Sequence, residues 1–213
     1  MKHCVRLLLT LVLSCFGPTG VARAPHPSAS IHPIHPAAQP VSLAHGYSNL
    51  PSSFEPNRGQ FDSAISFGSQ RPAYSLLLNA TSATLKMHNS ENSQTASLTM
   101  QFQGANESST VRGLNQLSGV TNYFYGARRN WITSVPNYEK VRVENMYPGI
   151  DAVYYGNHSR FEYDLIVKPG GSPDQIDIVF DRGANLAVDD TGDLVITLPD
   201  HQVRQSKPLI YQP

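Results

Sequence analysis

The sequence predicts an all-β protein, an antiparallel β-sandwich or open barrel built from short strands. From residue 54 onward, apolar and polar residues alternate in short runs, as expected for strands with one buried face. Breakers of hairpin length, rich in Gly, Pro, Asn and Asp, separate these runs. No window has the apolar spacing of a helix of three turns. Together these features indicate hairpin-connected strands packed in layers.

The expected strands follow one another along the chain. They are YSLLLN (residues 74–79), ATLKMH (83–88), SLTMQF (97–102), YEKVRV (138–143), IDAVYY (150–155), FEYDLIVK (161–168), IDIVFD (176–181) and DLVITL (193–198), then residues 201–206 and 209–211. Alternation within 161–168 places Phe161, Tyr163, Leu165 and Val167 on one face, which we expect in the core. The turn DDTGD (189–193) should close a hairpin, because Asp and Gly favour turns and the EF-hand calcium spacing is missing.

The first 24 residues have the pattern of a secretory signal peptide. Lys2 and Arg6 form a basic start, the apolar run LLLTLVLSCF (7–16) follows, and ARA (22–24) provides small residues for cleavage after Ala24. The run is too short for a membrane-spanning helix. Lipidation at Cys15 is an alternative, although the residues before it fit a lipoprotein signal poorly. The sequence therefore predicts a secreted or cell-surface protein.

Residues 25–53 are rich in Pro and His and poor in charge, which predicts a disordered linker before a domain at 54–213. Cleavage of the signal would remove both cysteines and leave 13 basic and 16 acidic residues, a net charge of −3. A chain of this net charge lacks the excess of basic residues that is typical of nucleic-acid-binding proteins. We expect no metal site, since the linker histidines are irregularly spaced, and no cofactor.

The motif FEPNRGQFD (54–62) joins the linker to the first strands. Glu55 precedes a proline and is biased to an extended conformation, the Asn57 side chain can close a turn, and Gly59 can adopt a positive φ. Arg58 is expected to pair with Glu55, Asp62 or a distant acid. These four residues, Glu55, Asn57, Arg58 and Gly59, predict a structural clasp; a ligand-binding loop is the alternative.

Two patterns could support chemistry. Glu162 and Asp164 lie on one strand face at a spacing that a glycosidase pair could use, but neighbouring Lys140, Arg142 and Lys168 favour cross-strand ion pairs instead. The chain has no Gly-x-Ser-x-Gly, no His-Glu-x-x-His and no phosphate-binding glycine loop. We therefore assign no catalytic residue, and a glycoside hydrolase-like enzyme stays the third alternative.

The stretch TNYFYGARRNW (121–131) combines aromatic rings with two arginines. Aromatic rings stack on sugar faces and arginine binds hydroxyl groups, so Tyr123, Tyr125, Arg128 and Trp131 could form a carbohydrate-binding platform. The same alternation is also typical of the edge of a core. The sequence is compatible with a carbohydrate-binding platform and with a core edge.

In order, the segments FEPNRGQFD, GLNQLSGVTNYFYG, VPNYEKVRVENMYPGIDAVYYG, FEYDLIVKPGGSPDQIDIVF, DDTGDLVITL and VRQSKPLIYQ resemble a domain of unknown function. That domain precedes SBBP repeats, which are β-propeller-type repeats, in large secreted or cell-surface bacterial proteins, some of them S-layer-like. The resemblance extends over residues 50–212 and implies location and architecture, without catalytic residues.

These observations predict a non-enzymatic module with a structural, adhesion or assembly role, whose partners are glycans or other surface proteins; the alternative is a carbohydrate-binding module. The resemblance also implies that further strands of the domain follow residue 213. Without them, we expect the edge at residues 209–211 to promote self-association.

Overall fold

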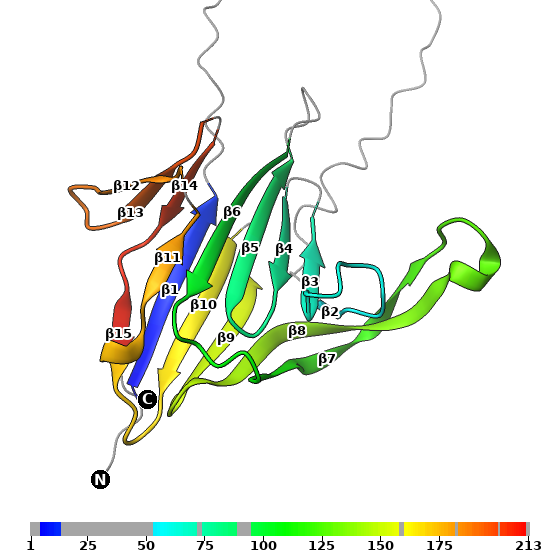
Figure 1. Cartoon of the computed structure of the whole chain (residues 1–213), viewed down its shortest axis with the longest axis horizontal. Coiled ribbons are helices and arrows are strands. Elements are labelled where there is room, and N and C mark those ends of the chain that lie inside the picture. The colour runs from blue at the N-terminus through cyan, green and yellow to red at the C-terminus, as the bar shows by residue number, and fades with distance from the viewer. Residues whose placement is uncertain are drawn as a thin grey trace, which may run out of the picture.

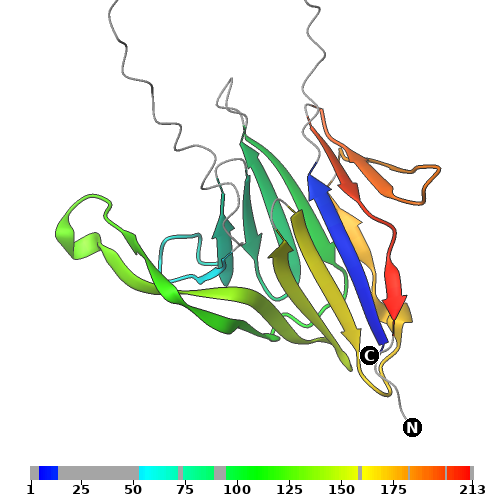
Figure 2. The same cartoon turned by 180° about the vertical axis from the view of Figure 1, so that it is seen from behind.

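A computed structural model describes residues 5–13, 53–71, 74–88, 95–157, 160–181, 183–199 and 201–211. Within these residues the chain is all-β, with two short 3-10 helices, η1 (Arg128–Asn130) and η2 (Pro173–Gln175). The strands form two antiparallel hydrogen-bonded sheets, and neither sheet closes on itself (Figures 1 and 2). The predicted fold class is thereby confirmed. Apart from Ser53, the predicted linker lies outside the described residues.

The larger sheet has nine strands. In spatial order they are β12 (Asn185–Val188), β13 (Leu194–Thr197), β14 (Gln202–Gln205), β1 (Val5–Leu13), β10 (Arg160–Val167), β9 (Ile150–Asn157), β8 (Ile132–Tyr147) and β7 (Thr110–Tyr123), with β15 (Leu209–Tyr211) pairing β1 beside this path. The smaller sheet has six, in the order β11 (Ile178–Phe180), β6 (Thr95–Phe102), β5 (Ser82–His88), β4 (Tyr74–Leu78), β3 (Phe67–Gln70) and β2 (Glu55–Pro56).

The core lies between the two sheets. On β10, the predicted core face of Phe161, Tyr163, Leu165 and Val167 is buried. Opposite it, Leu76, Leu85 and Met100 of the smaller sheet contribute to the same hydrophobic cluster. Stacked and tilted contacts join Tyr154 to Phe161 and Tyr163, with ring centroids 5.9 and 6.0 Å apart. Period-two alternation therefore predicted this layer correctly.

The Asp-rich turn closes the β12–β13 hairpin, as predicted from its residue types. One oxygen of Asp189 accepts hydrogen bonds from the Thr191 hydroxyl at 2.6 Å and from the backbone N–H groups of Thr191 and Asp193. Arg204 of β14 pairs with the other oxygen of Asp189. The Thr191 hydrogen bond, with these backbone and charge contacts, lowers the pKa of Asp189 to about 2. The turn is thus held by its own polar groups and one arginine.

The sequence expectations did not include four of the described strands, β1, β2, β3 and β7. The apolar residues predicted to be the centre of a signal peptide form β1, which lies inside the larger sheet. The polar stretch before the aromatic residues forms β7, a strand of 14 residues that alternation did not predict. The residues of β7 are exposed or only half-buried except for Tyr123, so the strand needs few apolar residues.

Candidate functional site

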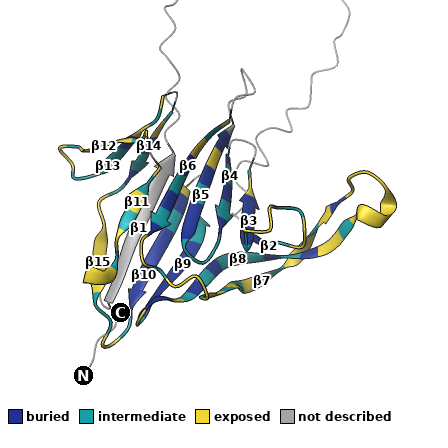
Figure 3. Cartoon of the chain, in the orientation of Figure 1, coloured by how far each residue is buried: buried dark blue, intermediate teal, exposed yellow. Residues whose placement is uncertain are grey.

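The hairpin of β7 and β8 projects beyond the sandwich (Figure 1). From Lys140 to Tyr147, β8 pairs with β9 on one side and lies over the core. Its first half, from Ile132 onward, pairs with β7 and, at Tyr138, with Phe54 through an isolated bridge. A two-stranded ribbon is marginally stable in water, so this one needs contacts at its root. Figure 3 shows the exposed residues that gather toward its free end.

The tip of the ribbon, defined here as residues 124–131, exposes large apolar rings. Tyr125 is 73% exposed, Phe124 58% and Trp131 41%. Soluble proteins rarely gather exposed aromatic residues without a binding role. No acidic residue occurs between Glu107 and Glu139, whereas Arg128 and Arg129 lie in the tip itself. The tip is therefore aromatic and cationic.

Contacts within the tip arrange its rings. The Phe124 and Trp131 rings meet edge to face, with centroids 4.9 Å apart, and the Arg128 guanidinium lies 5.7 Å from the centre of the Trp131 ring. Gly126 has a φ of +64°, which lets the chain turn between the two aromatic segments. Tyr125 points its ring toward that of Tyr123, at 6.0 Å. The structure thus brings Arg128 and Trp131 of the predicted platform together, while the Tyr125 ring contacts Tyr123.

Tyr123 does not belong to this exposed surface. It is 8% exposed, and its hydroxyl donates a 2.6 Å hydrogen bond to the buried carboxylate of Glu55. Burial, reinforced by this hydrogen bond, raises the pKa of Tyr123. The core-edge interpretation of the aromatic stretch therefore applies to Tyr123 alone. Phe124, which the sequence interpretation left out of the platform, is exposed beside it and packs against Trp131.

The motif at residues 54–62 contacts the ribbon from Tyr138 in β8 to Tyr123, the last residue of β7 before the tip. Phe54 is buried and exchanges two backbone hydrogen bonds with Tyr138 of β8, at 2.8 and 2.9 Å. Its neighbour Glu55 accepts the Tyr123 hydrogen bond from β7. The motif thus contacts both strands of the ribbon.

The loop that follows is organised by the Asn57 side chain. Its amide oxygen accepts hydrogen bonds from the N–H groups of Gly59 and Phe61, and its amide nitrogen donates to the carbonyls of Asp62 and Ile65. Gly59 has a φ of +111°, a conformation that other residues rarely adopt. The Phe61 ring lies so close to the backbone of Gly68 that any side chain there would overlap it. These contacts are those that a structural clasp requires.

Arg58 differs from the expectation. Its side chain is exposed, and among the described residues its guanidinium forms no ion pair, so the predicted pairing with Glu55 or Asp62 is wrong. Glu55 is instead bonded to Tyr123, and Asp62 caps the N–H of Ala64. Only the backbone N–H of Arg58 contributes, through a hydrogen bond to Gln60.

This difference predicts unequal effects for two neighbouring substitutions. We expect Asn57→Ala to lower the free energy of unfolding by about 1 to 3 kcal/mol, because partly buried carbonyl and N–H groups lose their partner. Arg58→Ala, the matched control, should change it by no more than about 0.5 kcal/mol. Urea denaturation of both variants measures the difference, and an equal loss in the two would contradict the assigned role of Asn57.

The carboxylates Glu162 and Asp164 lie on β10 beside Tyr155 of β9. Asp164 is 7% exposed and accepts a 3.0 Å hydrogen bond from the Tyr155 hydroxyl. Burial and the charge of Asp164 raise the pKa of Tyr155. Among the described residues, neither carboxylate forms the expected cross-strand ion pair, because Arg142 and Lys168 pair with Asp151 instead. Lys140 lies over the Tyr155 ring, 5.1 Å from its centre.

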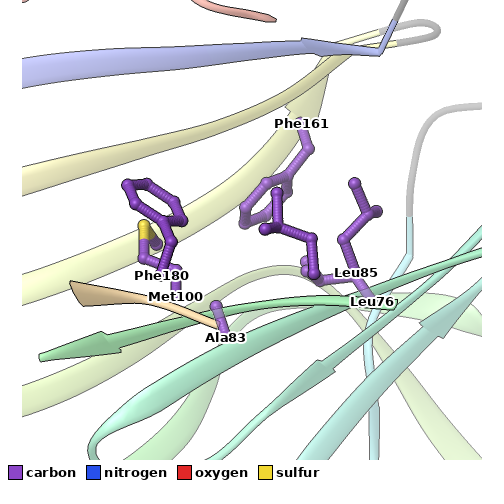
Figure 4. Close-up of a pocket in the computed structure, with 7 residues that line it drawn as sticks. Leu76, Ala83, Leu85, Met100, Phe161 and Phe180 are labelled. Atoms are coloured by element: carbon purple, nitrogen blue, oxygen red, sulfur yellow. The ribbon is translucent and has the colours of Figure 1, made fainter. Parts of the chain in front are cut away.

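An apolar pocket lies between the two sheets (Figure 4). Its lining comes from five strands and comprises Leu76, Ala83, Leu85, Leu98, Met100, Phe161 and Phe180. Such side chains offer no acid, base or nucleophile. The pocket is therefore a gap in core packing.

Within the described residues, no group of three or more His, Cys, Asp or Glu side chains is placed to hold a metal ion. None of the helices in that part of the chain is long and apolar enough to span a membrane.

The sheets and the projecting hairpin define an antiparallel β-sandwich domain with an aromatic, cationic tip. The chain belongs to the family described as a domain of unknown function, DUF7948, whose family model matches residues 54–213. No curated protein matches the chain, and no solved structure matches it either.

Proposed function

We propose that this protein is a non-enzymatic binding module, exported to the cell surface or beyond, that contacts its partner through the tip of the β7–β8 hairpin. The observation that carries the proposal is the exposed pair of rings, Phe124 and Trp131, beside Tyr125 and Arg128 at the end of a projecting ribbon. Aromatic residues and arginine are the residue types that dominate binding energy at protein interfaces. An adhesion or assembly role fits this position, since the tip can reach a partner without obstruction by the sandwich.

Contacts between the motif at residues 54–62 and the ribbon fix the position of the tip. Phe54 bonds to Tyr138 of β8, and Glu55 accepts a hydrogen bond from Tyr123, directly before the tip, so the rings are presented on a fixed element. Rigid aromatic anchors lose little conformational entropy on binding. The absence of an assembled acid–base pair at Asp164, whose carboxylate is bonded to Tyr155, supports a role without catalysis.

The proposed location comes from the sequence. The basic start, the apolar run and the small residues at 22–24 support cleavage of a signal peptide after Ala24. The resemblance to domains that precede SBBP repeats supports a place in a secreted, S-layer-like or other cell-surface bacterial protein. The partners proposed are glycans or other surface proteins; nucleic acid is disfavoured by the charge of −3.

A second candidate function is carbohydrate binding, and one observation favours it. Tyr125 and Trp131 are exposed, and Arg128 lies over the Trp131 ring. Exposed aromatic rings stack on sugars, and arginine bonds their hydroxyl or acidic groups. The arginine pair and the missing acids favour acidic glycans over neutral ones.

The test compares binding of the wild type, Trp131→Ala and Tyr125→Ala to bacterial cell surfaces and to a glycan array. Loss of an anchor of this kind costs about 2 kcal/mol, so we expect binding to fall about 30-fold. Val188→Ala, which removes an exposed apolar residue of β12, is the control and should leave binding unchanged.

Each proposal has a distinct outcome. Glycan binding that disappears with Trp131→Ala supports carbohydrate binding as the way in which the module contacts its partner. Surface binding that is indifferent to both tip variants would refute the assignment of the tip. Hydrolysis of a glycan or peptide that disappears with Glu162→Gln or Asp164→Asn would replace the binding module with an enzyme.

A further inference from the structure

Strand β1 completes the larger sheet from its interior (Figures 1 and 2). On one side it pairs with β10 from Val5↔Val167 to Leu11↔Phe161. On the other side its second half pairs with β14 and its first half with β15. Both flanking edges therefore direct their backbone hydrogen bonds to the same nine residues.

These nine residues coincide with the segment that export is expected to remove. The apolar run that forms most of β1 is the centre of the predicted signal peptide, and the predicted cleavage position follows Ala24. The chain without residues 1–24 would keep β10 on one side and β14 with β15 on the other. With strands about 4.8 Å apart, the two edges would face each other across about 10 Å.

The slot between these edges, here called the β1 slot, borders the core. Directly opposed residues of an antiparallel pair share one face of the sheet, so positions 7, 9 and 11 lie on the face of Leu165, Tyr163 and Phe161. Tyr163 and Leu165 are fully buried, as is Val203 of β14. An empty slot would open this part of the core to water and leave two rows of backbone groups unpaired.

Without β1, two features disfavour direct pairing of β10 with β14. These are the relative direction of the two strands and the loss of the partner of β15. β10 and β14 both run antiparallel to β1, so they are parallel to each other and would have to form a new type of pair. Among the described strands, β15 pairs only with β1. Its residues Leu209 and Ile210 are 63% and 72% exposed even with β1 present.

We propose that the β1 slot is an acceptor site for a β-strand supplied by another polypeptide chain. The slot is empty only if the proposed export removes residues 1–24. The slot itself is independent of the binding role proposed for the hairpin tip. The occupant is an extended segment of about nine residues, antiparallel to β10, with apolar residues at the three alternate positions that face the core. In the chain as it is synthesised, Val5–Leu13 occupies the site itself.

The experiment uses the full chain with a protease recognition sequence inserted between residues 25 and 45. After folding, the chain is cut, and a fluorescent peptide with the sequence of Val5–Leu13 is added. A second cut chain carries Leu9→Lys, which places a charge opposite the buried Tyr163 and should release the N-terminal fragment. We expect this chain to take up the wild-type peptide, to gain thermal stability and to slow amide exchange in β14 and β15.

Matched peptides test the face requirement. Leu8→Lys changes the position opposite Asp164, on the other face, and should bind within about threefold of the wild-type peptide. Leu9→Lys makes the same change one residue later and should bind at least about 100-fold more weakly. Equal affinity of the two peptides would overturn the proposal.

Two further outcomes would support the acceptor site. One is a cut Leu9→Lys chain that unfolds and refolds only with the wild-type peptide. The other is a dimer that the peptide separates into monomers, since a second copy is then the donor chain. A cut chain that binds no peptide, whether it keeps its melting temperature or stays unfolded, would refute it. Trp131→Ala, which tests the tip, should leave peptide binding unchanged, so the two proposals can fail separately.

Discussion

Replacing Asp151 with alanine is expected to lower the free energy of unfolding by about 3 to 5 kcal/mol, the cost of removing one partner from a buried charged group. Asp151 lies on β9 and its side chain has no exposed surface. Its carboxylate accepts a 2.8 Å hydrogen bond from the N–H of Asn145, pairs with Lys168 at 2.7 Å and pairs with Arg142. Removal takes this acceptor from the Asn145 N–H and from Arg142, and leaves Lys168 with its 3.1 Å hydrogen bond to the Asn145 side-chain oxygen.

The same contacts predict how this contribution depends on pH. Burial alone would raise the pKa of Asp151, but the Asn145 hydrogen bond together with Lys168 and Arg142 outweighs it and lowers the pKa below its usual value. A depressed folded-state pKa means that the stabilisation is complete above the unfolded-state pKa, about 3.9, and is lost as pH falls through the folded value. The wild type should therefore lose its advantage over Asp151→Asn below about pH 4.

Denaturant melts of the wild type, Asp151→Ala and Asp151→Asn between pH 7 and pH 2 measure both effects. Glu144→Ala serves as the control, because Glu144 forms an exposed pair with Arg112 at 2.5 Å. Such a pair contributes at most about 1 kcal/mol. A difference between wild type and Asp151→Asn that stays constant down to pH 2 would contradict the assigned ion pairs.

The β-sandwich could be predicted from the sequence because apolar alternation and turn residues are visible within short segments. In residues 161–168 a strict alternation marks the face that becomes the core, and in the Asp-rich turn the residue types specify the hairpin. The partner of Arg142 could not be predicted in this way. Asp151 comes directly after a turn glycine and the apolar Ile150, and only the register of β8 with β9 places it beside Arg142.

The candidate site was predicted in part. Tyr125, Arg128 and Trp131 share one short stretch, so their proximity follows from the chain itself. The burial of Tyr123 depends on Glu55, which lies 68 residues away and is brought close only by the fold. β7 was missed because its polar residues and glycines are typical of loops, and a strand with one buried residue needs no apolar alternation.

The second large effect is expected at Phe54, where alanine should lower the free energy of unfolding by about 3 to 5 kcal/mol, as for other buried Phe→Ala changes. Phe54 is 1% exposed and belongs to the central hydrophobic cluster. Alanine would leave a cavity beside β8 while the backbone hydrogen bonds with Tyr138 remain available. Phe54→Leu, which keeps most of the apolar volume, should cost less than half as much.

Thermal melts and hydrogen exchange of both variants separate a structural clasp from a ligand loop at this motif. If Phe54 anchors the ribbon, Phe54→Ala should speed amide exchange in the first half of β8 more than in β5, which is paired on both sides within the smaller sheet. Partner binding by the folded fraction should persist, since the rings of Tyr125 and Trp131 keep their exposed places at the tip. Lost binding with an unchanged melting temperature would instead make residues 54–62 the ligand loop, because a cavity in the core cannot form without a loss of stability.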